Sequence, residues 1–140
     1  MSDLQHRAEA EIVARHAFFV DWYTGKAGDR AMADCARSFA PDFRMIWPDG
    51  TEHARDAVVD MLRGMGDTKG DEYAIEVAMR NAAMLAPDLV LITFDEHQWT
   101  AEGKNLRRAS ALFSPDAGAP EGVVWRHLHQ TWITADDTTQ

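Results

Sequence analysis

Residues 89–134 decide the fold of this chain, and they read LVLITFDEHQWTAEGKNLRRASALFSPDAGAPEGVVWRHLHQTWIT. Runs rich in β-branched and aromatic residues alternate here with turn sequences, a pattern typical of antiparallel strands. The stretch at 101–104 has the length of a hairpin connection, and the segment at 115–120, rich in Pro, Gly and Ala, is a loop. The sequence therefore predicts three successive strands, at residues 89–100, 105–114 and 122–134.

The residues before this segment add further strands and three helices. A partly alternating run at 73–85 ends in Ala-Pro-Asp and predicts the first strand of a four-strand meander. Further upstream, apolar residues recur at helical spacing. They predict a helix from Ser2 to Gly25, a second from Gly28 to Pro41, and a third from Thr51 or Glu52 to the glycines at 64–70, with a short strand at 43–47 before the turn Pro48-Asp49-Gly50.

Helices followed by a meander predict an α+β fold, and the length of 140 residues suits a single domain spanning residues 1–140. We expect three N-terminal helices packed on one face of a strongly curved, mostly antiparallel sheet. Such a sheet leaves a cone whose open end is an internal pocket. Five tryptophans are many for so small a domain, and we expect them to line the core or this pocket.

The composition argues against several classes of partner and compartment. With 14 basic and 23 acidic residues the net charge is −9, which repels nucleic acids and anionic membranes. We find no apolar run of the roughly 20 residues that a membrane helix needs. Charges throughout the first 20 residues argue against a secretory signal peptide, and the single cysteine, Cys35, cannot form an internal disulfide. We expect a cytoplasmic protein, and the periplasm is the alternative for a chain without disulfides.

The last predicted strand carries two histidines. Strict alternation places Trp125, His127, His129 and Thr131 on one face, with the two imidazoles roughly 7 Å apart. The row could line a pocket, hold a metal, shuttle a proton, or be hydrogen-bonded structural histidines. A metal would need a third ligand, and we see no motif that supplies one, so we expect no metal site.

A second candidate is Glu96. Val90, Ile92, Phe94, Glu96 and Gln98 share one face of their strand, so three apolar residues lead to a carboxylate and an amide. Such a change occurs at a pocket mouth or where a strand simply reaches solvent. In a half-apolar cleft, desolvation would raise the pKa of Glu96, as a general base or acid requires.

Two adjacent arginines, Arg107 and Arg108, lie one on each face of the next strand, and both faces are largely apolar. One of them should therefore point inward, where it would pair with Glu96 or bind an anionic ligand. A cross-strand ion pair is the alternative. We take Arg108 as the ligand-binding candidate.

The order of these segments resembles the SnoaL-like branch of the nuclear transport factor 2-like superfamily, over roughly residues 5–134. The segments that carry the resemblance are Phe39–Gly50, Phe94–Glu96, Arg108–Ser110 and Trp125–His129. The superfamily contains isomerases, dehydratases, cyclases, hydrolases and non-catalytic dimerisation domains, so the likeness implies a fold rather than a function. It also implies a homodimer formed through the outer face of the sheet.

One position departs from the isomerase-type members of this superfamily. Their acidic general base precedes the strand-ending proline, where this chain has Trp47. An indole cannot accept a substrate proton, so the ketosteroid isomerase mechanism is not supported. The remaining catalytic candidates are Glu96, His127 and His129, and we assign ligand contacts to Tyr23, Trp47, Arg108 and Trp125.

Two functions fit these observations. One is an enzyme that acts by proton transfer on a small, largely hydrophobic molecule, as an isomerase, dehydratase or cyclase. The other is a ligand-binding or dimerisation domain without catalysis. No phosphate-binding glycine loop, nucleophile elbow or dinucleotide fingerprint occurs in the sequence, so we expect no cofactor.

Overall fold

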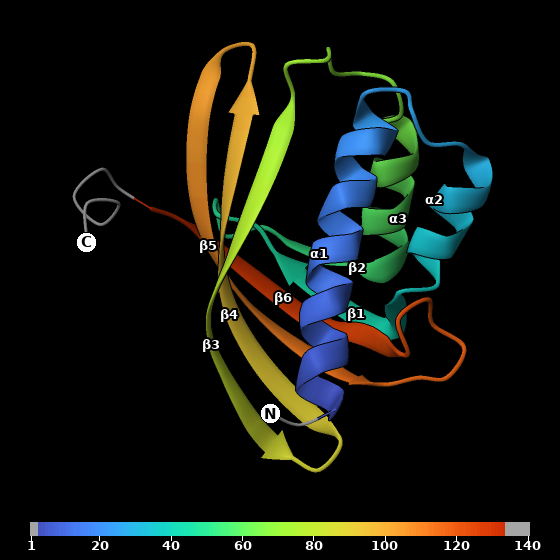
Figure 1. The fold of residues 1–140 in the computed structure, drawn as a ribbon, viewed down its shortest axis with the longest axis vertical. Coiled ribbons are helices and arrows are strands. Elements are labelled where there is room, and N and C mark those ends of the chain that lie inside the picture. Colours follow the sequence, from blue (N-terminus) through green and yellow to red (C-terminus); the bar gives the residue numbers. More distant parts are fainter. Residues whose placement is uncertain (1–2, 134–140) are drawn as a thin grey trace.

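A computed structural model describes residues 3–133, which form three helices and six strands (Figure 1). The helices are α1 (Asp3–Tyr23), α2 (Asp29–Ala36) and α3 (Arg55–Gly64). The strands are β1 (Phe39–Ile46), β2 (Glu52–Ala54), β3 (Ala74–Ala86), β4 (Leu89–Thr100), β5 (Gly103–Pro115) and β6 (Val123–Trp132). The predicted helix start at Ser2 and strand end at Thr134 lie outside the described residues. None of the described helices is long and apolar enough to cross a membrane.

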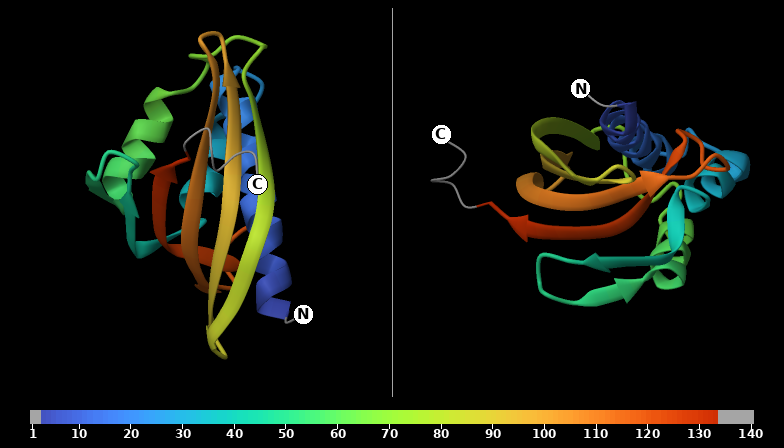
Figure 2. Two further views of the ribbon diagram at one scale, coloured as in Figure 1. Left: turned by 90° about the vertical axis from the view of Figure 1, so that its left-hand side faces the viewer. Right: turned by 90° about the horizontal axis from the view of Figure 1, so that it is seen from below.

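All six strands belong to one sheet, in the order β2-β1-β6-β5-β4-β3. Only β1 and β6 run parallel, and every other neighbouring pair is antiparallel. The sheet is strongly curved, and the three helices lie on the same side of it (Figures 1 and 2). The predicted α+β class, with helices packed on a curved and mostly antiparallel sheet, is confirmed.

The junction between α2 and β1 differs from the prediction. The helix ends at Ala36, and β1 begins at Phe39 rather than at residue 43. The hydroxyl of Ser38 donates to the Cys35 carbonyl at 2.6 Å, and the Ser38 carbonyl accepts from the Trp125 amide at 2.9 Å. Pairing with β6 therefore draws the chain into the sheet before Pro41 is reached.

The start of the third helix also differs, because a short strand precedes it. β2 pairs with β1 through a turn at residues 47–51, in which the Trp47 amide donates to the Thr51 carbonyl at 2.9 Å. Gly50 has a φ of +87°, a conformation that glycine adopts without strain. The helix predicted at residue 51 or 52 consequently begins at Arg55.

A β-bulge in β6 changes which residues share a face. Leu112 pairs with His127 and Phe113 pairs with Trp125, so Arg126 is an extra residue in β6. Trp125 and Leu128 therefore both point inward and are buried, whereas the Arg126 side chain is exposed. The predicted shared face of Trp125, His127 and His129 is wrong, because it assumed strict alternation.

The core lies between α1 and the inner face of the sheet, and Trp125 is at its centre with 2% of its surface exposed. Its ring packs against Phe113 with centroids 4.5 Å apart. Its indole N–H donates to Glu11 Oε2 at 2.7 Å, and Glu11 also accepts two hydrogen bonds from Arg15, at 2.8 and 2.9 Å. This buried, paired carboxylate fixes the position of Trp125 relative to α1.

Candidate functional site

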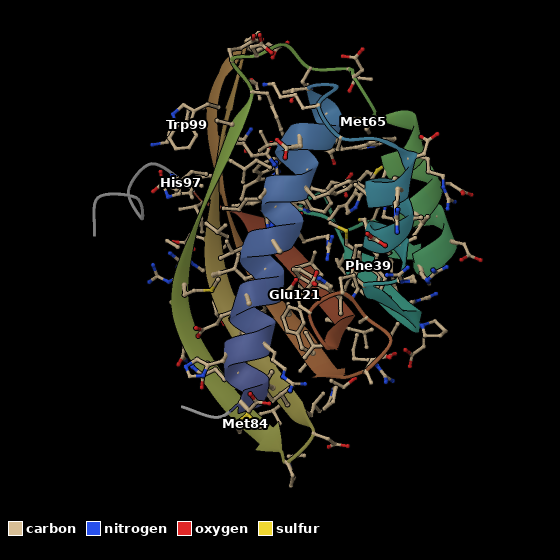
Figure 3. All side chains as sticks on the ribbon, turned by 45° about the vertical axis from the view of Figure 1, so that its right-hand side comes forward. Phe39, Met65, Met84, His97, Trp99 and Glu121 are labelled. Atoms are coloured by element: carbon tan, nitrogen blue, oxygen red, sulfur yellow. The ribbon has the colours of Figure 1, made fainter. Side chains whose placement is uncertain are left out.

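A cavity of about 420 Å³ lies between the helices and the inner face of the sheet. Residues from α1, α3, the β1–β2 turn and the inner face of β4, β5 and β6 contribute to it. Phe39 and Met65, which both line it, lie on the helix side of the sheet, whereas His97 and Trp99 project from the opposite side (Figure 3). The lining residues are His16, Phe19, Tyr23, Phe39, Met45, Trp47, Pro48, Asp49, Val58, Met61, Leu62, Met65, Lys69, Tyr73, Ile75, Glu96, Gln98, Arg107, Trp125, Leu128, Gln130 and Trp132.

Helical spacing on α1 brings three side chains to the cavity. His16, Phe19 and Tyr23 lie three and four residues apart, so they follow one another along a single face of the helix. The rings of Phe19 and Tyr23 are stacked with centroids 5.9 Å apart, and His16 meets Phe19 edge to face at 5.4 Å. These contacts form an aromatic wall with one imidazole in it.

This imidazole, His16, forms a buried pair with Glu96 of β4. The Nδ1 atom of His16 lies 2.7 Å from the Ile12 carbonyl oxygen, so Nδ1 carries a proton and donates it. The Nε2 atom lies 2.9 Å from Glu96 Oε1. A hydrogen bond at that contact needs a second proton, which is held by either the imidazole or the carboxyl group.

The electrostatics place that proton on His16. Burial alone would lower the pKa of His16, but the charge of Glu96 and its hydrogen bond outweigh burial and raise the pKa. Burial likewise favours a raised pKa for Glu96, but His16, Arg107 and Gln98 together lower it well below its usual range. The pair is therefore an imidazolium and a carboxylate, and the raised pKa that we predicted for Glu96 is wrong.

Both carboxylate oxygens of Glu96 have neighbours that donate. Oε1 faces His16, and Oε2 accepts from the side-chain amide of Gln98. The Nε atom of Arg107 lies 3.8 Å from Oε2, which is an ion-pair distance but too long for a hydrogen bond. Only 4% of Glu96 is exposed, so these neighbours replace water around its charge.

Arg107 lines the cavity beside the pair formed by His16 and Glu96. Its terminal nitrogens donate to Asn105 Oδ1 at 3.2 Å and to Gln130 Oε1 at 3.5 Å, and its guanidinium lies 4.7 Å from the ring centroid of Trp132. Its buried Nε atom has no hydrogen-bond acceptor among the described residues. A buried donor without an acceptor is uncommon in folded proteins.

Two tyrosines complete the polar part of the lining. The rings of Tyr23 and Tyr73 lie 5.5 Å apart, at the end of the cavity where α1 ends and β3 begins. Burial raises the pKa of both phenols above the usual range, so both remain protonated at neutral pH. Each phenol can therefore donate a hydrogen bond to a group inside the cavity.

The family model for the C-terminal part of sucrose-6-phosphate phosphohydrolase matches residues 8–134. The chain belongs to this family. Sucrose-phosphatase 1 of Nicotiana tabacum is 24% identical over 127 residues, and the probable sucrose-phosphatase 2 of Arabidopsis thaliana is 25% identical over 125 residues. The alignments cover 88% and 87% of this chain but only 30% and 29% of those proteins. The chain thus spans less than a third of the curated relatives it matches.

Solved structures support the same fold for this member of the sucrose-6-phosphate phosphohydrolase C-terminal family. A nuclear transport factor 2-like protein of unknown function from Pseudomonas aeruginosa has a TM-score of 0.77 and 25% identity, covering 91% of this chain and 99% of that one. A ketosteroid isomerase-like protein from Erwinia carotovora atroseptica has a TM-score of 0.69 and 10% identity, covering 96% and 99%. The resemblance to the nuclear transport factor 2-like superfamily is confirmed.

In this family member, the residues predicted from the sequence divide into two groups. Tyr23, Trp47, Glu96 and Trp125 line the cavity. Arg108, His127 and His129 are not among the described residues that line it, and their positions follow from the sheet pairing. Arg108 is opposite Asp95 on the outer face and pairs with it at 2.8 and 3.2 Å, while the bulge at Arg126 keeps both histidines off the inner face.

Among the lining residues that the sequence analysis missed, His16, Arg107 and Tyr73 matter most for the site, and two of these three left a signal in the sequence. His16 follows the apolar Ile12 by four residues in the helix predicted from Ser2 to Gly25, so both lie on one face of that helix. The hairpin alone favours Arg107 over Arg108. A loop of two or four residues puts Glu96 opposite an odd-numbered residue of β5, and opposite residues point to the same face of the sheet. Arg107 therefore shares the face of Glu96. The position of Tyr73, at the start of a mostly exposed strand, had no such signal.

Within residues 3–133, no group of three or more His, Cys, Asp or Glu side chains is arranged to hold a metal ion. That no metal or cofactor takes part stays a prediction. The roles we assigned to Glu96 and to the ligand-binding residues also stay predictions, although their positions are now known.

Proposed function

We propose that this protein binds a small, largely apolar molecule in the 420 Å³ cavity and does so without catalysis. The observation that carries the proposal is that the two groups best placed for acid–base chemistry, His16 and Glu96, form a buried pair with each other. Both ring nitrogens of His16 and both oxygens of Glu96 are already engaged by neighbours. Protonation of Glu96 by a substrate would cost this ion pair, so the paired carboxylate is a weaker base than a free one.

The size and the lining of the cavity support binding. Sites for small molecules usually enclose about 300–1,000 Å³ and combine apolar walls with a few oriented polar groups. Here the apolar part of the lining includes the rings of Phe19, Trp47 and Trp132 and the side chains of Met61 and Leu128. The engaged polar groups are fixed in position, as a binding site requires.

A second candidate is proton transfer by Glu96, because its carboxylate lines the cavity together with the unionised phenols of Tyr23 and Tyr73. A carboxylate base beside phenol donors could abstract a proton from carbon while a phenol stabilises the enolate. The lowered pKa of Glu96 makes it a weak base for this reaction. Turnover of an enolisable ketone that Glu96→Gln abolishes would favour this candidate over simple binding.

Binding is tested by blocking the cavity. We expect Met61→Trp, which places an indole in the lining, to weaken binding of the neutral probe 2-naphthamide about tenfold or more. Met84→Trp is the matched control, because Met84 lies on β3 outside the cavity lining and is exposed. The readouts are calorimetric titration and far-ultraviolet circular dichroism. Equal affinity in a folded Met61→Trp variant and in the wild type would refute the proposal.

We also infer a homodimer formed through the outer face of the sheet. Leu91, Leu112 and Trp99 lie on that face and are only partly covered. Ser110 is opposite both Thr93 and His129, near the middle of the face. We expect Ser110→Arg to shift the sedimentation coefficient from dimer to monomer, and a wild-type chain that sediments as a monomer would contradict the inference. Cytoplasmic residence stays a prediction.

A further inference from the structure

The charges around the cavity do not balance. Three cationic side chains line it, from His16, Lys69 and Arg107, and two anionic ones, from Asp49 and Glu96. Asp49 is exposed in the β1–β2 turn, and Lys69 is only partly buried. The inner part therefore holds His16, Glu96 and Arg107, which leaves one positive charge in excess within a chain whose net charge is −9.

The positive charge without a close anionic partner is that of Arg107. Glu96 forms its short contact with His16, at 2.9 Å, whereas its distance to Arg107 Nε is 3.8 Å. The hydrogen-bond partners of Arg107, Asn105 and Gln130, are neutral amides. An incompletely compensated guanidinium with 17% of its side chain exposed is a site for an anion, because burial without a counterion is costly.

We propose that Arg107 is the anchor for a ligand carboxylate, and that the ligand is a small monocarboxylate with a flat, apolar body. This inference rests on the proposed function, since it names the chemical class of the molecule that the cavity takes. One negative charge completes the balance of the inner part. A phosphate with two charges would add one more than the balance needs, close to the carboxylate of Glu96.

The surroundings of Arg107 fit the rest of such a molecule. A guanidinium presents a planar set of donors that matches a carboxylate, and here its central carbon lies over the Trp132 ring, 4.7 Å from the centroid. The phenols of Tyr23 and Tyr73 line the same cavity and provide further donors. Beyond these polar groups, the rings of Phe19 and Trp47 offer flat apolar contacts to the body of the ligand.

Two ligands of nearly the same shape test the anchor. These are 2-naphthoate, which is anionic, and 2-naphthamide, which is neutral, and both are titrated into the wild type and into variants by calorimetry. We expect the wild type to prefer 2-naphthoate. A charge-assisted hydrogen bond lost in Arg107→Gln should weaken 2-naphthoate binding about 10- to 100-fold and change 2-naphthamide binding about twofold at most.

Arg108→Gln is the control, because it makes the same substitution and the same change in net charge one residue away on the outer face. We expect it to keep the preference for 2-naphthoate. Arg107→Lys retains the charge and loses the planar donors, so we expect an intermediate preference. This variant also provides a test if Arg107→Gln does not fold, as judged by circular dichroism.

The outcomes separate the two proposals. Equal binding of both probes to the wild type, or a preference that persists in Arg107→Gln, overturns the anchor and leaves cavity binding intact. A preference lost equally in Arg107→Gln and Arg108→Gln also overturns it, since that result reflects net charge alone. If a folded wild type binds neither probe, both the anchor and the proposed binding function fail.

Discussion

Replacement of His16 by leucine is the sharpest test of the buried pair on which the functional argument depends. The substitution removes the cation that lies 2.9 Å from Glu96 and leaves a carboxylate that is 4% exposed. Removing one partner of a buried ion pair costs about 3–5 kcal/mol. Because Gln98 and Arg107 remain beside Glu96, we expect the lower end of that range, about 3 kcal/mol of unfolding free energy.

The dependence of this loss on pH has a definite form. The pKa of Glu96 is lowered by folding, so its contribution to stability is complete above the unfolded pKa of about 4.3 and is lost as the pH falls toward the folded value. The pKa of His16 is raised, so its contribution is complete below the unfolded pKa of about 6.5 and is lost as the pH rises toward the folded value. We therefore expect the largest deficit between about pH 4.3 and pH 6.5.

The assay is urea denaturation followed by tryptophan fluorescence, at several pH values. His6→Leu is the matched control at an exposed position of the same helix, and we expect it to change stability by about 0.5 kcal/mol or less. The double variant with Glu96→Gln should be more stable than His16→Leu alone, because no buried charge is left. A loss below about 1 kcal/mol for His16→Leu, or a double variant no more stable than the single one, would refute the assignment of an ion pair.

Three further substitutions or treatments test other parts of the structure. Trp125→Phe removes the donor to Glu11, and we expect a loss of about 1–3 kcal/mol in urea denaturation. Burial raises the pKa of the Cys35 thiol to about 12, so iodoacetamide at pH 8 should label it at least about 100-fold more slowly in the native protein than in urea, by mass spectrometry. Gly25→Ala should lower the melting temperature, because Gly25 has a φ of +81° and a Cβ there would lie 2.5 Å from Asp67 Oδ1.

The strands of the meander were predictable because their apolar residues follow the period of a pleated sheet. β3, β4, β5 and β6 begin and end within about two residues of the predicted positions wherever both ends are described. The inward direction of Glu96 followed from the same period, since Val90, Ile92 and Phe94 before it are fully buried. Local periodicity thus carried most of the fold and one of the central site residues.

What the sequence could not provide depends on contacts between distant segments. The early start of β1 results from hydrogen bonding between Ser38 and Trp125, which are 87 residues apart. The lowered pKa of Glu96 depends on His16, a partner from α1 that the sequence does not place beside it. Desolvation alone was a reasonable basis for the opposite direction, and only the structure shows that the partners of Glu96 outweigh it.

The extra residue in β6 has a consequence for comparing this chain with its relatives. Arg126 shifts odd and even positions, so Trp125 and the even-numbered Leu128 and Gln130 face the same way. In a relative without the extra residue, the inward-facing positions of β6 would be either all odd-numbered or all even-numbered. An alignment of such a relative with this chain would need a gap at Arg126 before the lining residues of β6 are matched.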